Sequence, residues 1–88
     1  MTDLTKLAER VEALTGPFDN ELDVMVEIAL FKPGKVYSNI RTNSAGTKVI
    51  CTDLMGNSVT FWAREWTDPN RRKDTAACLR AIGSKNDD

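Results

Sequence analysis

The 88-residue sequence has few of the side chains on which catalysis and metal binding depend. It contains no histidine, which excludes Ser-His-Asp and Cys-His catalytic groups and the commonest zinc ligand. Its two cysteines, Cys51 and Cys78, are 27 positions apart and cannot complete a four-ligand metal site within one chain. Both have apolar sequence neighbours, so we expect buried free thiols rather than a disulfide.

Acid–base catalysis without histidine would need two carboxylates held close together. Asp53 lies near a predicted turn, whereas Glu65 and Asp68 flank Trp66. The sequence therefore places no two of these groups on one rigid face. It also has no glycine-rich phosphate-binding motif. We expect a protein that is not an enzyme and that binds no metal or cofactor.

A basic run, Arg71-Arg72-Lys73, falls in the first turn of the last predicted helix. It is either a solvated helix start or a site where helix N–H groups and arginine side chains bind an anion. Nearby, Trp62 and Trp66 enclose Arg64, a pattern that could stack on the bases of single-stranded nucleic acid. Aromatic residues at a sheet edge are more often part of the core. The net charge of −1 also disfavours strong non-specific binding of nucleic acid.

Charges are distributed unevenly along the chain. Residues 1–31 carry 2 basic and 7 acidic side chains, a sum of −5, and residues 32–88 carry 10 basic and 6 acidic ones, a sum of +4. One interpretation is mutual compensation across a compact fold. The other is a molecule with one acidic and one basic face, either of which could steer a partner.

Secondary-structure elements must position these side chains. The spacing of apolar residues and the residues typical of helix ends predict three helices. The first spans residues 2–14 and is ended by Gly16-Pro17. The last is capped by Thr67 or Asp68 and ended by Gly83. Residues 1–83 are then a single domain, and 84–88 are a disordered polar tail.

The middle helix begins after an Asp or Asn N-cap and spans residues 20–31. It is apolar on two sides, and only a narrow strip around Asp23 and Glu27 stays polar. A helix of this kind is usually buried on two sides, here between a neighbouring helix and a sheet. The alternative is that its second apolar stripe is a surface for self-association.

Between the second and third helices the hydrophobic period changes from 3.6 to 2, which predicts a three-stranded antiparallel meander. Val36 and Ile40 are expected on one face of its first strand and Tyr37 on the other. The three strands are predicted at residues 35–42, 47–54 and 58–64.

The second and third strands are predicted to form a hairpin around the three-residue loop Met55-Gly56-Asn57. This loop places Cys51 opposite Phe61 and Ile50 opposite Trp62, which matches apolar with apolar partners. Both faces of the hairpin then carry large apolar groups. Either helices cover both faces, or the face with Ile50, Trp62 and Tyr37 is a binding surface.

Together these elements predict an α+β single domain with an N-terminal helical hairpin, a three-stranded antiparallel β-meander and a C-terminal helix. The helices are expected to cover both sheet faces. No apolar run approaches the roughly 20 residues of a membrane-spanning helix, and no leader pattern is visible. We therefore expect a cytoplasmic protein with no membrane partner.

Four segments carry a resemblance to a known family. Residues 7–17 (LAERVEALTGP) lead into 20–30 (NELDVMVEIAL), and residues 60–69 (TFWAREWTDP) precede 76–81 (AACLRA). They resemble the paired opening helices and the closing strand-to-helix unit of the phage ABA (alpha-beta-alpha) sandwich domain family. The resemblance implies helices on both sides of the sheet and a phage or prophage setting in the bacterial host cytosol. It implies no assigned activity, so no functional residue is carried over.

We expect a small non-catalytic phage or prophage accessory protein that binds and occludes a host protein, for example as an anti-defence or anti-CRISPR-type inhibitor. One alternative is a nucleic-acid-binding module that uses the basic C-terminal half. Another is a self-associating phage structural protein, such as a homodimer. A few aromatic or arginine anchors carry most of the binding energy in such interfaces. The candidate partner-binding residues are Arg71, Arg72, Lys73, Trp66, Arg64, Lys48, Glu9 and Glu12.

Overall fold

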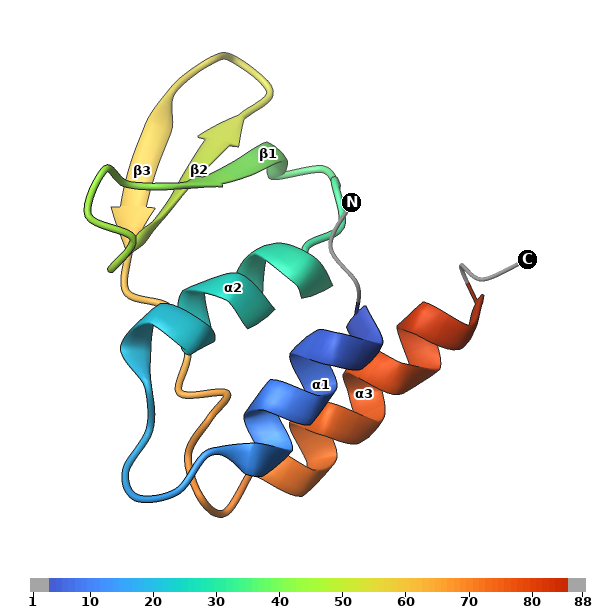
Figure 1. The fold of residues 1–88 in the computed structure, drawn as a ribbon. Helices are drawn as coiled ribbons and strands as arrows, with labels where there is room; N and C mark the ends of the chain where they lie inside the picture. The colour runs from blue at the N-terminus through green and yellow to red at the C-terminus, as the bar shows by residue number, and fades with distance from the viewer. Residues whose placement is uncertain (1–3, 86–88) are drawn as a thin grey trace.

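The computed structural model describes residues 4–85, and its helices and antiparallel sheet follow the predicted order. α1 and α3 lie side by side, α2 lies between this pair and the sheet, and the strands follow the order β1-β2-β3 (Figure 1). The α+β prediction is confirmed. The elements are α1 (Leu4–Ala13), α2 (Asn20–Leu30), β1 (Tyr37–Thr42), β2 (Val49–Asp53), β3 (Ser58–Phe61) and α3 (Arg72–Lys85). None of the helices within residues 4–85 is long and apolar enough to span a membrane.

The pairing of the helices differs from the predicted N-terminal hairpin. α1 packs antiparallel along α3, so that the start of α1 meets the end of α3, and it contacts α2 much less. Gly83 permits this approach, because a Cβ at that position would lie 3.3 Å from Leu4 Cβ. The prediction that Gly83 ends the last helix is wrong, since α3 continues to Lys85. Residues 86–88 of the predicted tail lie outside the described residues.

All three helices lie on one side of the sheet (Figure 1), so the prediction of helices on both sheet faces is wrong for the described residues. α2 is the helix that packs on β1 and β2. The physical reason is the pairing of α1 with α3, which buries the apolar stripe of each helix within the helical layer. Neither helix has a second apolar stripe with which to cover the far face of the sheet.

α2 follows its predicted pattern except in the burial of its polar strip. Asp19 is its N-cap, and Asp19 Oδ1 accepts a hydrogen bond from Leu22 N at 3.1 Å. Leu22 and Val26 belong to the helical core, while Val24 is buried facing the turn between β1 and β2. The predicted burial on two sides is therefore confirmed. The predicted polar strip is not a solvated surface, because Asp23 is only 1% exposed.

The turn between β2 and β3 is a three-residue loop of the predicted length, but it lies one position earlier, at Leu54-Met55-Gly56. Asp53 fixes the turn, since Asp53 Oδ1 accepts hydrogen bonds from the N–H groups of Met55 and Asn57, each at 2.9 Å. Gly56 has φ = +89°, a conformation that favours glycine.

The shifted turn changes the register of the hairpin. Cys51 lies opposite Val59 and Val49 lies opposite Phe61, two residues away from the predicted pairing. The predicted register is therefore wrong. Because side chains alternate with a period of 2, a shift of two residues leaves every side chain on its predicted face.

β1 departs from simple alternation at a β-bulge. The register shifts between Tyr37 and Asn39, which leaves Ser38 as an extra residue. The bulge places Tyr37 on the same face as Ile40, so the predicted assignment of these two residues to opposite faces is wrong. The rings of Tyr37 and Phe61 meet edge to face, with their centroids 6.0 Å apart.

Most of the core lies in the helical layer. The sheet contributes only Val49 and Cys51 to the fully buried apolar residues that the structure describes. Both cysteines are free, as predicted, but Cys78 is exposed on α3, so the prediction of a buried thiol is wrong at that position. The main cluster of buried residues is Leu7, Ala8, Val11, Leu22, Val26, Ala76 and Leu79.

Candidate binding site

Arg72 joins the ends of two helices. Its guanidinium donates hydrogen bonds to four backbone carbonyls: Nε to Thr67 O at 2.8 Å, Nη1 to Leu14 O at 3.0 Å, and Nη2 to Gly16 O and Pro17 O at 2.6 and 3.0 Å. These carbonyls lie just after α1 and just before α3. A guanidinium held in this way is not free to anchor a partner, so Arg72 stabilises the fold instead.

The other predicted charged residues are dispersed. Arg71 and Lys73 are exposed at the start of α3, and Glu9 and Glu12 are exposed on α1. Glu12 forms an ion pair with Arg80 of α3, and the hydrogen bond from Arg80 lowers the pKa of the Glu12 carboxyl. At this contact the acidic and basic halves of the sequence compensate each other.

A shallow hollow of about 500 Å³ near the start of α3 brings Arg64 and Arg71 together with Glu65 and Asp68. The Asp68 carboxylate is occupied by the local turn, because its Oδ1 accepts a hydrogen bond from Asn70 N at 2.9 Å. Charges of both signs meet in this hollow, so it is suited neither to an anion nor to a cation. Within residues 4–85, no three His, Cys, Asp or Glu side chains are grouped closely enough to hold a metal ion.

The two tryptophans differ in burial. Trp66 packs against the helical core, and its Nε1 is buried with no hydrogen-bond partner among the described residues. Arg64 Cζ lies 5.8 Å from the centroid of this ring. Trp62 is 67% exposed, and Lys48 Nζ lies 4.5 Å from its ring centroid. The structure thus forms two separate cation–π pairs rather than one platform for stacked bases.

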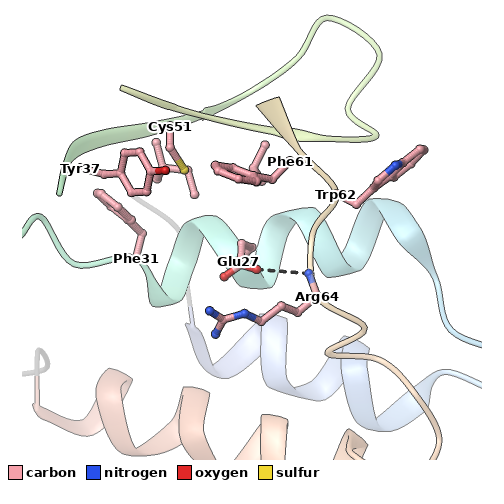
Figure 2. A pocket seen from close by; sticks show the side chains of 9 residues that line it. Glu27, Phe31, Tyr37, Cys51, Phe61, Trp62 and Arg64 are labelled. Carbon is pink, nitrogen blue, oxygen red and sulfur yellow. Dashed lines mark hydrogen bonds between the residues drawn. The ribbon is translucent and has the colours of Figure 1, made fainter. Parts of the chain in front are cut away.

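A partly open cavity of about 320 Å³ lies between α2 and the sheet (Figure 2). Its charged lining residues are Glu27 and Arg64, and the rest of the lining is aromatic or apolar. Figure 2 shows Phe31, Tyr37 and Phe61 on the Glu27 side of the cavity, whereas Trp62 points away from them. The uncharged lining residues include Phe31, Tyr37, Ile40, Cys51, Phe61 and Trp62.

Two carboxylates one turn apart on α2 hold the segment that follows β3. Asp23 Oδ1 accepts hydrogen bonds from Thr67 N and Thr67 Oγ1, each at 2.7 Å, and Glu27 Oε1 accepts one from Arg64 N at 3.2 Å. The polar strip of α2 therefore faces inwards and positions one edge of the cavity. Loss of hydration on burial raises the pKa of the Asp23 carboxyl. Asp23 Oδ2 has no hydrogen-bond partner among the described residues.

β3 is one edge of the sheet, and all four of its residues are exposed. Neither a charged residue nor a proline lies within Ser58–Phe61. The opposite edge, β1, has a bulge and carries Arg41, two features that discourage pairing with another strand. On the hairpin that ends with β3, Val59 is 44% exposed and Met55, at the tip, is 88% exposed.

Sequence reasoning missed Glu27 and Phe31 as site residues, and it assigned Tyr37 to an alternative binding face with Ile50 and Trp62. The bulge in β1 and the approach of α2 to the sheet bring them together, and neither is encoded in a local pattern. One signal was present, since the hairpin carries large apolar groups on both faces. That signal predicted either helices over both faces or a binding surface on the Trp62 face, and in the structure Phe61 and Trp62 are both exposed.

No protein-family model, no curated protein and no solved structure matches this chain. The resemblance to the phage ABA sandwich family therefore stays a prediction from the sequence segments that carry it. Function has to be argued from the surface and the cavity.

Proposed function

We propose that this protein is a small non-catalytic binding domain that occludes a protein partner through β3 and the apolar side chains around it. The observation that carries the proposal is the contrast between the two sheet edges. β1 is protected by a bulge and an arginine, whereas β3 presents an uncharged edge with exposed Val59 and Phe61. Soluble proteins generally block such an edge unless another chain pairs with it.

The partner that fits this edge is an extended segment of another protein that pairs with β3 as an additional strand. Main-chain hydrogen bonds supply affinity in this mode, and alternate side chains supply specificity. Trp62, which follows β3 directly and is largely exposed, is the aromatic anchor next to this edge. Tryptophan is among the residues that most often dominate binding energy at interfaces.

The setting of the proposal comes from the sequence resemblance alone. A phage or prophage protein acting in the cytosol of its host would bind a host protein, such as a defence component, and block its working surface. The exposed candidates Arg71, just before α3, Lys73 on α3 and Glu9 on α1 would then steer the encounter with the partner rather than anchor the complex.

The two alternative functions find less support in the geometry. The nucleic-acid alternative relied on a basic set with two stacking rings, namely Lys48, Arg64, Arg71, Arg72, Lys73, Trp62 and Trp66. Of these, the Arg72 guanidinium is bound to four carbonyls and Trp66 is packed on the core. Self-association through the second stripe of α2 relied on Val24 and Ile28. Val24 is buried, and Ile28 is half-buried beside the turn between β1 and β2.

The test is affinity capture from a nuclease-treated lysate of the bacterium in which the gene is found, with Val59→Lys as the disrupting variant. Val36→Lys is the matched control, since Val36 is also an exposed valine but lies just before β1, at the other edge. We expect one stoichiometric protein partner that binds the wild type and Val36→Lys but is lost with Val59→Lys. A partner retained by Val59→Lys, or recovery only when nuclease is omitted, would contradict the proposal.

A further inference from the structure

We infer that the cavity between α2 and the sheet binds a small organic cation with an alkylated ammonium head group. This inference concerns a different surface from the β3 edge and holds whether or not a protein partner pairs with that edge. Its basis is the combination of aromatic rings and one carboxylate around a space of about 320 Å³. That volume is at the lower end of the range for ligand sites, which limits the occupant to a small molecule.

The rings supply the first half of the recognition. Phe31 lies at the end of α2, Tyr37 begins β1 and Phe61 ends β3, so three separate elements bring aromatic groups to one cavity (Figure 2). The edge-to-face contact between Tyr37 and Phe61 fixes their relative orientation. Aromatic faces attract cations, and cages of such rings bind quaternary ammonium groups.

Glu27 supplies the second half, a negative charge at the cavity. Its Oε1 accepts the backbone N–H of Arg64, which leaves Oε2 for a ligand. Glu27 forms no ion pair with a Lys or Arg side chain among the described residues, although Arg64 lines the same cavity. Its charge is felt inside the cavity, since it helps burial to raise the pKa of the Cys51 thiol.

The positions of the nearby cations favour this occupant over an anion. Arg64 is the one basic residue in the lining, and its Cζ lies 5.8 Å from the Trp66 ring centroid. Figure 2 shows its guanidinium beside Glu27, on the side away from the Phe61 ring. Lys48 lies over Trp62. Both contacts show that the tryptophan rings of this domain attract cations. Among the described residues, the rings of Phe31, Tyr37 and Phe61 have no such contact.

The ligand must be weakly hydrated, because the remaining lining is apolar. An alkylated ammonium loses less hydration free energy on entering such a cavity than a bare ammonium or a metal ion does. A carboxylate beside the rings then compensates its charge.

The experiment is an NMR titration of the ¹⁵N-labelled protein with choline and, in parallel, with 3,3-dimethylbutan-1-ol, its neutral isostere. We expect choline to shift the amide signals of residues that line the cavity and to bind about tenfold or more tightly than the alcohol. Equal affinities would show that the cavity recognises only apolar volume and would overturn the inference. The absence of choline-dependent shifts at the cavity would overturn it as well.

The matched variants are Glu27→Gln and Glu21→Gln, which remove one negative charge each from the same helix. Glutamine at position 27 still offers an oxygen to Arg64 N, so the fold is expected to persist, and the amide spectrum checks this. Glu27→Gln should weaken choline binding about tenfold, whereas Glu21→Gln should leave it unchanged. Phe31→Leu, which keeps apolar bulk but removes a ring, provides a second test. Unchanged choline affinity in either Glu27→Gln or Phe31→Leu would contradict the inference.

Discussion

The helical layer and the sheet differ in how their side chains are used. In the helical layer, Val11, Val26 and Leu79 are fully buried, and Arg72 ties the ends of α1 and α3 together. In the sheet, only Val49 and Cys51 are buried, and β3 is exposed along its whole length. The comparison teaches that the stability of this small domain resides mainly in its helices. The sheet packs on one helix, and its exposed β3 edge and the cavity are the two places where we propose binding.

The largest expected effect on stability comes from truncating one large apolar side chain in each layer. Leu79→Ala should lower the free energy of unfolding by about 2–5 kcal/mol, because it leaves a cavity between α1, α2 and α3. Phe61→Ala should cost only about 1 kcal/mol, since the Phe61 side chain is already partly exposed. Urea denaturation of the two variants measures the difference. Equal losses would contradict the assignment of stability to the helical layer.

The next effect concerns Arg72, compared with its neighbour Arg71. Arg72→Lys should destabilise the protein by about 2–3 kcal/mol, because a lysine ammonium cannot reach four carbonyls with the geometry of a guanidinium. Arg71→Lys, at an exposed position, should change stability by less than about 0.5 kcal/mol. Thermal melts at one pH compare them directly. Similar melting temperatures for the two variants would contradict the structural role assigned to Arg72.

A pH dependence is expected from Asp23, which links α2 to the segment between the two layers. Burial raises the pKa of this carboxyl above its ordinary value of 3.8, so the folded state binds the proton more tightly than the unfolded state does. This tighter proton binding contributes to the free energy of unfolding. The contribution is fully present below pH 3.8 and is lost as the pH rises through the pKa of Asp23 in the folded state.

The variant that isolates this effect is Asp23→Asn, which keeps an oxygen to accept the hydrogen bonds from Thr67. The free energy of unfolding of this variant, relative to that of the wild type, should rise as the pH increases from roughly 3.5 to roughly 7. Urea denaturation at several pH values measures this difference. A difference between the two proteins that stays constant with pH would contradict the ionisation of Asp23 as its cause.

The smallest effect on stability is expected at the β3 edge. Val59→Lys should change the free energy of unfolding by less than about 0.5 kcal/mol, because the side chain is well exposed. The same variant should abolish binding of the protein partner proposed above. Loss of stability by more than about 1 kcal/mol would show that Val59 is structural and would make its binding defect uninformative.

Local patterns predicted a large part of this fold. The N-cap at Asp19, the two-sided burial of α2 and the three-residue hairpin loop all follow from signals within a few residues of each other. The position of the hairpin loop was harder to predict than its length. The hydrogen bonds that Asp53 Oδ1 accepts from Met55 N and Asn57 N place the loop one residue earlier than predicted.

The candidate site was predicted less well, because it depends on contacts between distant segments. Arg72 belongs to a basic run typical of a solvated helix start, yet three of the four carbonyls that it binds follow α1, more than fifty residues earlier. Tyr37 lines the cavity because of the bulge in β1, and no local sequence pattern predicts that bulge. Glu27 lay in a strip predicted to be polar, but the sequence does not show that this strip faces the segment after β3.

The central claim is that the helices hold the fold while β3 remains available to a partner. Native-state hydrogen exchange, followed by NMR residue by residue, tests it most directly. We predict that the slowest amides of α1 and α3 exchange only through global unfolding. The amides of β3 should open with a free energy at least about 2 kcal/mol lower. Equal protection of β3 and α3 would contradict the claim, because it would show that the sheet edge is as firmly held as the helical core.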